Sequence, residues 1–213
     1  IAHLPVGLYR PLLINDLLRA GVKLKLLIAD SFAWINEKMA GDLEQIRVVG
    51  SYFVEVWKAA GVDMGKVEVV WHKKHFDDPE YWKKVIIIAK NHTEARTKRA
   101  LQIAGRKEGE VNHAAQLFYP SMQAADIFQL DADIAQLGLD QRKANMLARE
   151  VADKLKWKKP VSVCHRMLLG LDGVKSASSS DEETSIDQEI DAKMSKSKPE
   201  TCIFVHDSTQ EIA

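Results

Sequence analysis

Residues 22–30 read Val-Lys-Leu-Lys-Leu-Leu-Ile-Ala-Asp, and this stretch decides the fold class. Apolar and charged residues alternate over its first half, and the second half is continuously apolar until Asp30. This composition is typical of a strand in the middle of a parallel sheet, where both faces are buried. We therefore expect a parallel strand whose carboxyl end carries the Asp30 carboxylate.

Helical and strand-like segments alternate along the rest of the chain. The spacing of apolar residues predicts helices over residues 12–20, 42–61, 79–105, 110–128 and 139–155. Short apolar runs predict further strands over residues 67–71, 133–137 and 160–164. Such alternation predicts an α/β fold with a Rossmann-like, doubly wound parallel sheet, in which ligands bind beyond the carboxyl ends of the strands.

The composition limits the class of protein. With 213 residues and 46% hydrophobic content, the chain can bury one sizeable core. Lys plus Arg equals Asp plus Glu at 30 each, so any RNA binding needs a local patch. The best basic cluster comprises Arg96, Lys98, Arg99, Arg106 and Lys107, and a solvated helix face is the alternative interpretation.

Several features predict a cytoplasmic protein without a membrane segment or a metal centre. No run of about 18 apolar residues and no signal peptide is present. Cys164 and Cys202 lie in apolar runs, as expected of core thiols in a reducing compartment, and the histidines show no zinc-ligand spacing with them. Trp57, Trp71 and Trp82 are expected in the core or at a dimer face.

Residues 172–192 differ from the rest of the chain. They contain seven carboxylates and a single lysine, Lys175, with few large apolar side chains. Such a segment cannot bury enough apolar surface to order itself, so we expect a flexible acidic surface insert.

The insert leads directly into residues 193–197, which read Lys-Met-Ser-Lys-Ser. Two ammonium groups and two hydroxyls on a short loop can gather around a triphosphate as it loses pyrophosphate. A solvated basic loop is the alternative, and corroboration must come from elsewhere in the chain.

A second group of polar residues follows the predicted helix and strand near the middle of the chain. Tyr119, Gln123 and Asp126 fall at i, i+4 and i+7, so one helix face carries all three side chains. Asp140 and Gln141 follow Gly138 at the opening of a helix, where backbone amides favour anions and a carboxylate can hold ribose hydroxyls. Taken alone, these residues also fit ordinary solvated helix positions.

These blocks, with residues 29–36 (Ala-Asp-Ser-Phe-Ala-Trp-Ile-Asn), closely resemble tyrosyl-tRNA synthetases of the eukaryotic and archaeal type. The resemblance is collinear from Ile1 to about Asp207. It implies a class I synthetase catalytic domain over residues 1–213, with an incomplete N-terminus and the family's anticodon-binding domain outside this chain. It also implies a tyrosine–tRNA ligase that uses L-tyrosine, ATP with Mg²⁺ and tRNA(Tyr), with no tightly bound metal.

The resemblance assigns roles at the tyrosine site. Tyr119, Gln123 and Gln141 would face the backbone end of tyrosine, and Asp126 would accept a hydrogen bond from its phenol. A site built to pair a buried hydroxyl disfavours phenylalanine, because the unmatched carboxylate would stay desolvated.

The resemblance also assigns the ATP site. Ile1-Ala2-His3 resembles the end of the HIGH motif, with Ala2 in place of glycine. Lys193, Lys196 and His3 would be catalytic, stabilising the pentacoordinate phosphorus and the leaving pyrophosphate. The full set expected to bind ATP is Ala2, His3, Gly138, Asp140, Met167, Leu168, Lys193, Met194, Ser195, Lys196 and Ser197.

Three alternatives stay open from the sequence. A tryptophanyl-tRNA synthetase shares the fold, although Asp126 suits an indole pocket poorly. A different adenylyl or nucleotidyl transferase would share His3 and the lysine loop, but has no need of Tyr119, Gln123 and Gln141 together. A synthetase-like half could serve assembly or RNA binding only. In each synthetase case we expect a homodimer, or a fused pseudo-dimer, formed through the segment before Tyr119.

Overall fold

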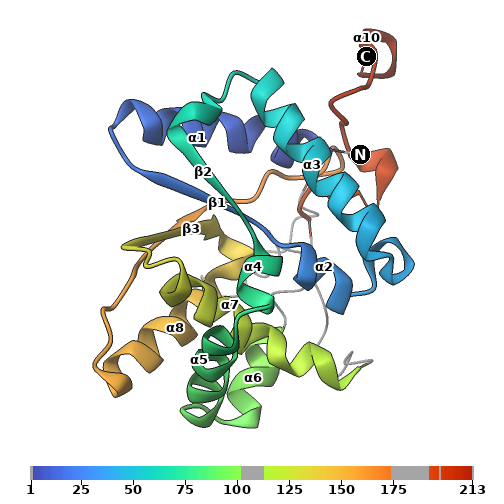
Figure 1. Ribbon diagram of the computed structural model, residues 1–213. Coiled ribbons are helices and arrows are strands. Elements are labelled where there is room, and N and C mark those ends of the chain that lie inside the picture. Colours follow the sequence, from blue (N-terminus) through green and yellow to red (C-terminus); the bar gives the residue numbers. More distant parts are fainter. Residues whose placement is uncertain (1, 102–112, 174–191, 197, 213) are drawn as a thin grey trace, which may run out of the picture. The chain divides into compact units, whose positions relative to one another are not determined.

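The computed structural model describes residues 2–101, 113–173, 192–196 and 198–212 (Figure 1). The chain divides into two compact units. The first comprises Ile1–His72 with Leu168–Ala213, and the second comprises Lys73–Met167. No helix among the described residues is long and apolar enough to cross a membrane.

The first unit contains a pair of parallel strands, β1 (Leu24–Ile28) and β2 (Val67–Trp71). Leu24 is paired with Val67 at one end and Ile28 with Trp71 at the other. The helices in the described part of this unit are α1 (Arg10–Arg19), α2 (Asp30–Ile35), α3 (Leu43–Ala59) and α10 (Thr209–Ile212). A π-helical turn at Pro5–Tyr9 and 3-10 turns at Lys38–Gly41, Met64–Lys66 and Pro199–Thr201 complete it.

The core of the first unit joins the strand pair to α1 and α3. Ile14 of α1, Ile28 of β1, Trp57 of α3 and Val67 of β2 are buried in one cluster. The indole N–H of Trp57 donates to the carbonyl of Val6 at 2.9 Å, so its burial leaves no polar group unsatisfied. The expectation of a core or interface tryptophan is confirmed for Trp57.

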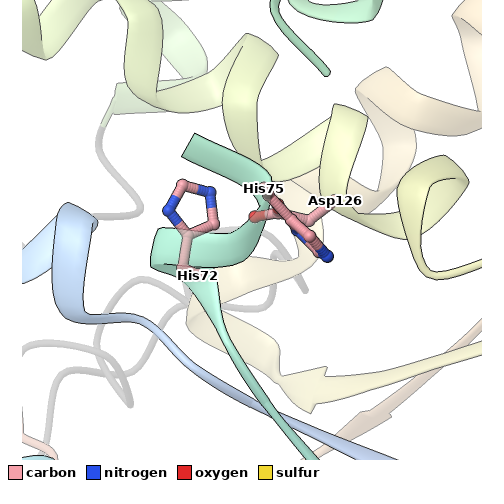
Figure 2. A group of neighbouring side chains, drawn as sticks. All are labelled: His72, His75 and Asp126. Atoms are coloured by element: carbon pink, nitrogen blue, oxygen red, sulfur yellow. The ribbon is translucent and has the colours of Figure 1, made fainter. Parts of the chain in front are cut away.

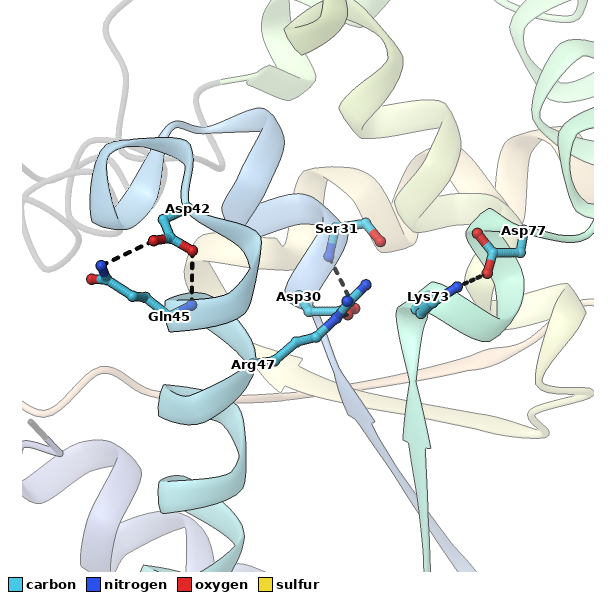
Figure 3. A network of polar contacts seen from close by, with 7 residues as sticks. All are labelled: Asp30, Ser31, Asp42, Gln45, Arg47, Lys73 and Asp77. Carbon is cyan, nitrogen blue, oxygen red and sulfur yellow. Dashed lines mark hydrogen bonds and ion pairs between the residues drawn. The ribbon is translucent and has the colours of Figure 1, made fainter.

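Polar contacts fix the beginnings of α2 and α3 (Figure 3). The Asp42 carboxylate accepts the backbone N–H of Gln45 at 3.0 Å, which caps α3 as its sequence predicts. The Asp30 side chain is fully buried and accepts from the backbone N–H of Ser31 at 3.0 Å and from Arg47 Nε at 3.3 Å. Asp30 therefore begins α2, whereas the sequence predicted it at the end of the strand; β1 stops at Ile28.

The second unit contains the parallel pair β3 (Ile134–Gly138) and β4 (Val161–His165), with Ile134 opposite Val161 and Gly138 opposite His165. Its helices are α5 (Pro79–Lys90), α6 (Glu94–Leu101), α7 (Tyr119–Gln129) and α8 (Arg142–Leu155), with 3-10 turns at Ala114–Phe118 and Leu139–Gln141. The short helix α4 (His72–Phe76) begins at the last residue of the first unit.

Helix α7 is the most buried element of the second unit, and it contacts α5 on one side and α8 on another. Met122 and Ala125 of α7 are fully buried, as are Val85 of α5 and Leu147 of α8. Because α7 is enclosed in this way, polar side chains on it are held in an interior environment rather than on a solvated face.

The α/β fold class with parallel strands is confirmed, and every predicted strand is found within two residues of its expected bounds. The single helix expected over residues 79–105 is wrong. Helix α5 ends at Lys90, where the Asn91 side chain donates to the carbonyl of Ile87 at 2.8 Å, and Thr93 Oγ accepts from the N–H of Arg96 as α6 begins. The helix expected over residues 139–155 starts as a 3-10 turn. Residues 174–191 of the expected insert lie outside the described part of the chain.

Candidate functional site

The predicted tyrosine-site residues lie together in the second unit. Tyr119 begins α7, and Gln123 and Asp126 follow on the same helix. The Gln123 side-chain amide donates to Gln141 Oε1 at 3.0 Å, which links α7 to the turn after β3. The structure therefore brings Gln141 into contact with the helix that carries the other three predicted residues.

Asp126 is 4% exposed, so its carboxylate needs hydrogen-bond donors. His75 Nδ1 lies 2.9 Å from Asp126 Oδ1 (Figure 2, where His72 of the same helix is also drawn). The buried hydroxyl of Tyr81 donates to the carbonyl of Met122 at 3.1 Å. Burial foremost, and then the Asp126 charge, raise the pKa of Tyr81, which keeps that phenol protonated. Sequence analysis gave His75 and Tyr81 no functional role.

The ends of β3 and β4 form the expected nucleoside region. A Cβ atom on Gly138 would lie 2.7 Å from Asp140 Oδ1 and 3.2 Å from Met167 Sδ, so no side chain fits there without a shift of its neighbours. Gln136 of β3 and His165 of β4 meet across the pair, with 2.6 Å between Gln136 Nε2 and His165 Nδ1. Sequence analysis missed these two polar residues, although both lie near the carboxyl ends of strands, where a ligand is expected.

The lysine loop lies in the first unit and is attached to the segment after β4. The N–H of Met194 donates to the carbonyl of Leu168 at 2.8 Å, the N–H of Gly170 donates to the carbonyl of Ala192 at 2.9 Å, and Leu169 and Lys193 form an antiparallel bridge. Met194 is 5% exposed, so its side chain anchors the loop while lysines lie on either side of it. Ser197 is outside the described residues.

The charge of Lys196 in this loop affects His3 in the N-terminal segment. Lys196 Nζ lies 5.8 Å from the centroid of the Phe53 ring, and lost hydration followed by the nearby Lys38 charge lower the pKa of Lys196. Burial, with Lys196 as the next cause, lowers the pKa of His3 to about 4. His3 is therefore a neutral hydrogen-bonding group at pH 7 rather than a third cation. Ala2 beside it is fully buried.

Two described residues of the basic cluster, Arg96 and Lys98, are engaged by carboxylates. Arg96 makes two hydrogen bonds to the carboxylate of Glu150, at 2.9 and 3.0 Å, and lowers the pKa of Glu150. Lys98 forms an ion pair with Glu94. Arg106 and Lys107 are outside the described residues. Within the described part of the cluster, the solvated and paired helix face thus accounts for Arg96 and Lys98.

Comparison with known proteins places the chain in a family. Residues 3–191 match the family of class I tRNA synthetases for tryptophan and tyrosine. The chain is 45% identical over 213 residues to tyrosine–tRNA ligase 1, cytoplasmic, of Arabidopsis thaliana, covering 99% of this chain and 51% of that protein. It is 47% identical over 200 residues to the tyrosine–tRNA ligase of Sulfurisphaera tokodaii, covering 93% and 54%. The chain thus spans about half the length of these curated relatives.

Solved structures agree with this assignment. The tyrosyl-tRNA synthetase of Pyrococcus horikoshii complexed with L-tyrosine superimposes with a TM-score of 0.87 at 40% identity, covering 99% of this chain and 61% of that one. The tryptophanyl-tRNA synthetase of Aeropyrum pernix K1 has a TM-score of 0.67 at 22% identity and covers 99% of this chain and 53% of that one, which shows the shared fold alone. The chain therefore belongs to the class I tRNA synthetases for tryptophan and tyrosine, and its sequence is of the archaeal and eukaryotic tyrosyl-tRNA synthetase type.

Proposed function

We propose that this chain carries the catalytic region of a tyrosine–tRNA ligase. A carboxylate oxygen of tyrosine attacks the α-phosphorus of ATP, the bond from that phosphorus to the bridging oxygen breaks, and pyrophosphate leaves with the electron pair. A hydroxyl of the terminal adenosine of tRNA(Tyr) then attacks the carbonyl carbon of tyrosyl-adenylate, and AMP leaves. Neither step needs a protein nucleophile, so the work of the residues is positioning and charge stabilisation.

The tyrosine side of the proposed site rests on α7. Asp126 would accept the phenol hydrogen bond, and Tyr119, Gln123 and Gln141 would hold the backbone end. The contact between Gln123 and Gln141 supports this, since it joins two polar groups of the kind that an ammonium and a carboxylate require.

The ATP side of the proposed site has two parts. Gly138, Asp140, Met167 and Leu168 would receive the nucleoside, and the missing side chain of Gly138 lets Asp140 and Met167 approach the backbone there. Ala2, His3 and the loop Lys193, Met194, Ser195, Lys196 and Ser197 would receive the phosphates. Mg²⁺ would arrive on ATP and offset its charge, and we assign no residue of the chain to that ion.

The observation that carries the proposal is the enclosure of Asp126. This carboxylate is 4% exposed and contacts His75, and its remaining acceptor capacity suits the hydroxyl of a substrate phenol. The test is pyrophosphate exchange into ATP, measured with tyrosine, phenylalanine, tryptophan and no amino acid. We expect exchange with tyrosine. Exchange with tryptophan instead would identify a tryptophanyl enzyme, and no exchange with any of them would leave an assembly or RNA-binding role.

A single substitution tests the pocket. Asp126→Ala should lower kcat/KM for tyrosine about 10- to 100-fold, because a hydrogen bond to a charged group contributes about 1.5–3 kcal/mol. The KM for ATP should change little. The matched control is Asp153→Ala, which removes an exposed carboxylate on α8 and should leave exchange unchanged.

We also propose that the protein works as a homodimer or a fused pseudo-dimer in the cytoplasm, with tRNA(Tyr) as its macromolecular substrate. The supporting surface lies on the second unit, where Ile86 is 48%, Ile87 39% and Phe118 43% exposed. Trp82 and Phe118 make an edge-to-face contact that connects α5 to the turn before α7. The Arabidopsis relative is named cytoplasmic, which agrees with this location.

A further inference from the structure

We infer that His75 is a specificity-determining residue for tyrosine, which acts by holding the Asp126 carboxylate in a fixed orientation. The inference rests on the proposed function, because it concerns how the phenol is recognised. His75 does not itself need to touch the substrate, so it is a positioning residue.

The geometry places His75 as the donor to Asp126. His75 lies on α4 and Asp126 on α7, 51 positions apart in the sequence, and each side chain is 5% exposed. Figure 2 shows the imidazole of His75 beside the carboxylate of Asp126. The 2.9 Å between Nδ1 and Oδ1 is the distance of a hydrogen bond from an Nδ1–H to a carboxylate oxygen, and the proton is accordingly assigned to Nδ1.

His75 is itself held in place by a neighbouring buried residue. The rings of His75 and Tyr81 lie with their centroids 5.5 Å apart, and Tyr81 is anchored by its hydrogen bond to the carbonyl of Met122. Met122 belongs to α7, the helix that carries Asp126. The three residues therefore form a closed support, in which α4, α5 and α7 fix one another through side chains.

This support matters because an aspartate carboxylate turns easily about its last bond, where the torsional wells are broad. A hydrogen bond from His75 fixes the plane of the carboxylate. Two carboxylate oxygens offer about four acceptor sites, so the contacts of Asp126 with His75 and Tyr81 leave capacity for a substrate hydroxyl at a defined angle.

A fixed carboxylate discriminates more strongly than a mobile one. Phenylalanine brings no hydroxyl, so it leaves a desolvated acceptor, and the penalty is greatest when Asp126 cannot turn toward water or another donor. Without His75, the carboxylate of Asp126 would lose one of its two restraints and keep only its contact with Tyr81, so it could turn more freely. The transition state with tyrosine should then lose stabilisation, while the transition state with phenylalanine should lose none. The ratio of kcat/KM for tyrosine to kcat/KM for phenylalanine should therefore fall.

The test compares His75→Phe, which keeps a planar ring without a donor, with His75→Asn, which keeps a side-chain N–H near the position of Nδ1. Pyrophosphate exchange is measured on the full polypeptide with tyrosine and with phenylalanine. We expect His75→Phe to lower kcat/KM for tyrosine about tenfold or more, with kcat/KM for phenylalanine not lowered and the KM for ATP unchanged. His75→Asn should recover most of the loss. His206→Phe, at a surface histidine, is the control.

A double-mutant cycle separates positioning from a general structural role. In an Asp126→Asn background, His75→Phe should cause less than a twofold further loss, because the group through which it acts has already changed. An equal fall for tyrosine and phenylalanine in His75→Phe, or a full additional loss in the Asp126→Asn background, would overturn the inference.

Two further readings keep the inference testable on its own. If His75→Phe does not fold, the ¹⁵N shifts of the wild-type His75 ring decide: a protonated Nδ1 is expected, and an unprotonated Nδ1 would refute the donor role. If the wild type shows no tyrosine-dependent exchange, the proposed function fails. If the wild type shows normal tyrosine-dependent exchange and His75→Phe discriminates between tyrosine and phenylalanine as the wild type does, the role inferred for His75 is wrong and the proposed function stands.

Discussion

At the scale of single residues, Gly138 shows how a glycine at the end of a strand lets two candidate site residues pack against the backbone. The residue closes β3, and its missing side chain leaves Asp140 and Met167 close to the backbone. Both neighbours approach the position that a Cβ atom would occupy, so the site depends on glycine for space rather than for an unusual backbone conformation.

Gly138→Ala should therefore weaken nucleotide binding. The added methyl group must displace Asp140 Oδ1, 2.7 Å from its position, and overpacking of this kind costs about 1–3 kcal/mol. We expect the KM for ATP to rise about 10-fold with tyrosine binding retained, as measured by exchange kinetics and by tyrosine titration. Gly65→Ala, at an exposed turn of the first unit, serves as the control. An unchanged KM for ATP in Gly138→Ala would contradict the proposed nucleoside position.

His3 provides a second prediction at this scale, which concerns pH. Its pKa in the folded protein is about 4, against an ordinary value of 6.5. Below pH 6.5 the unfolded chain takes up a proton that the folded chain does not, so the free energy of unfolding should fall as the pH is lowered from about 6.5 toward 4. His3→Gln should reduce this slope.

The measurement is urea unfolding of the wild type and of His3→Gln between pH 4 and pH 7, with an NMR titration of the His3 ring. The pKa of His92 is also lowered, chiefly by burial, so part of the slope should remain in the variant. An NMR pKa for His3 near 6.5 would refute the neutral role assigned to it.

At the scale of elements, the sequence predicts strands better than helix boundaries or side-chain partners. Strands β1 to β4 were found from short, β-branched and largely apolar runs bounded by turn residues, although each run contains a polar residue and none is buried on both faces. The break between α5 and α6 was not predicted, although Asn91 and Thr93 are residue types that favour helix ends; their contacts show that α5 stops and α6 begins there.

The candidate site divides in the same way. Tyr119, Gln123 and Asp126 could be predicted to share a face because helical spacing is regular. The partner of Asp126 could not, since His75 lies 51 residues earlier and no local pattern links the two. Residues that bind through long-range packing require the fold itself.

The lysine loop yields the prediction for this scale. Its backbone is fixed by Leu168 and Leu169, and Met194 is buried, so the two lysines are presented from an anchored segment. Lys193→Ala and Lys196→Ala should each lower the rate of adenylate formation about 100-fold or more, since one preorganised donor contributes about 3–4 kcal/mol to the transition state. Tyrosine affinity should change little.

Single-turnover stopped-flow kinetics separates these effects. Lys198→Ala, an exposed lysine just past the motif, is the matched control and should behave as the wild type. If the loop variants form adenylate at the normal rate but bind tyrosine more weakly, the proposed role of the two lysines at the ATP phosphates is wrong.

At the scale of the whole molecule, each unit has its own parallel strand pair and its own buried residues. The second unit has large apolar side chains on its surface as well as in its core. Ile86 and Ile87 are exposed next to Ile88, which is fully buried, so α5 carries apolar side chains on more than its inward face. Such side chains are expected where another copy of the fold covers them.

Ile86→Asp should therefore weaken self-association of the full polypeptide. A charge placed in an apolar interface must be desolvated without a partner, which costs far more than the same charge on a free surface. Sedimentation equilibrium should show the wild type at twice the mass of its chain. The dissociation constant of the Ile86→Asp dimer should be at least about 10-fold higher than that of the wild type. Val48→Asp is the matched control, because Val48 is 68% exposed on α3 in the first unit and lies outside the proposed face.

If the two variants associate equally, α5 does not form the interface. If the wild type has the mass of one chain at every concentration, the homodimer is excluded, and the same residues should then be covered within a single polypeptide, where Ile86→Asp would lower the free energy of unfolding instead.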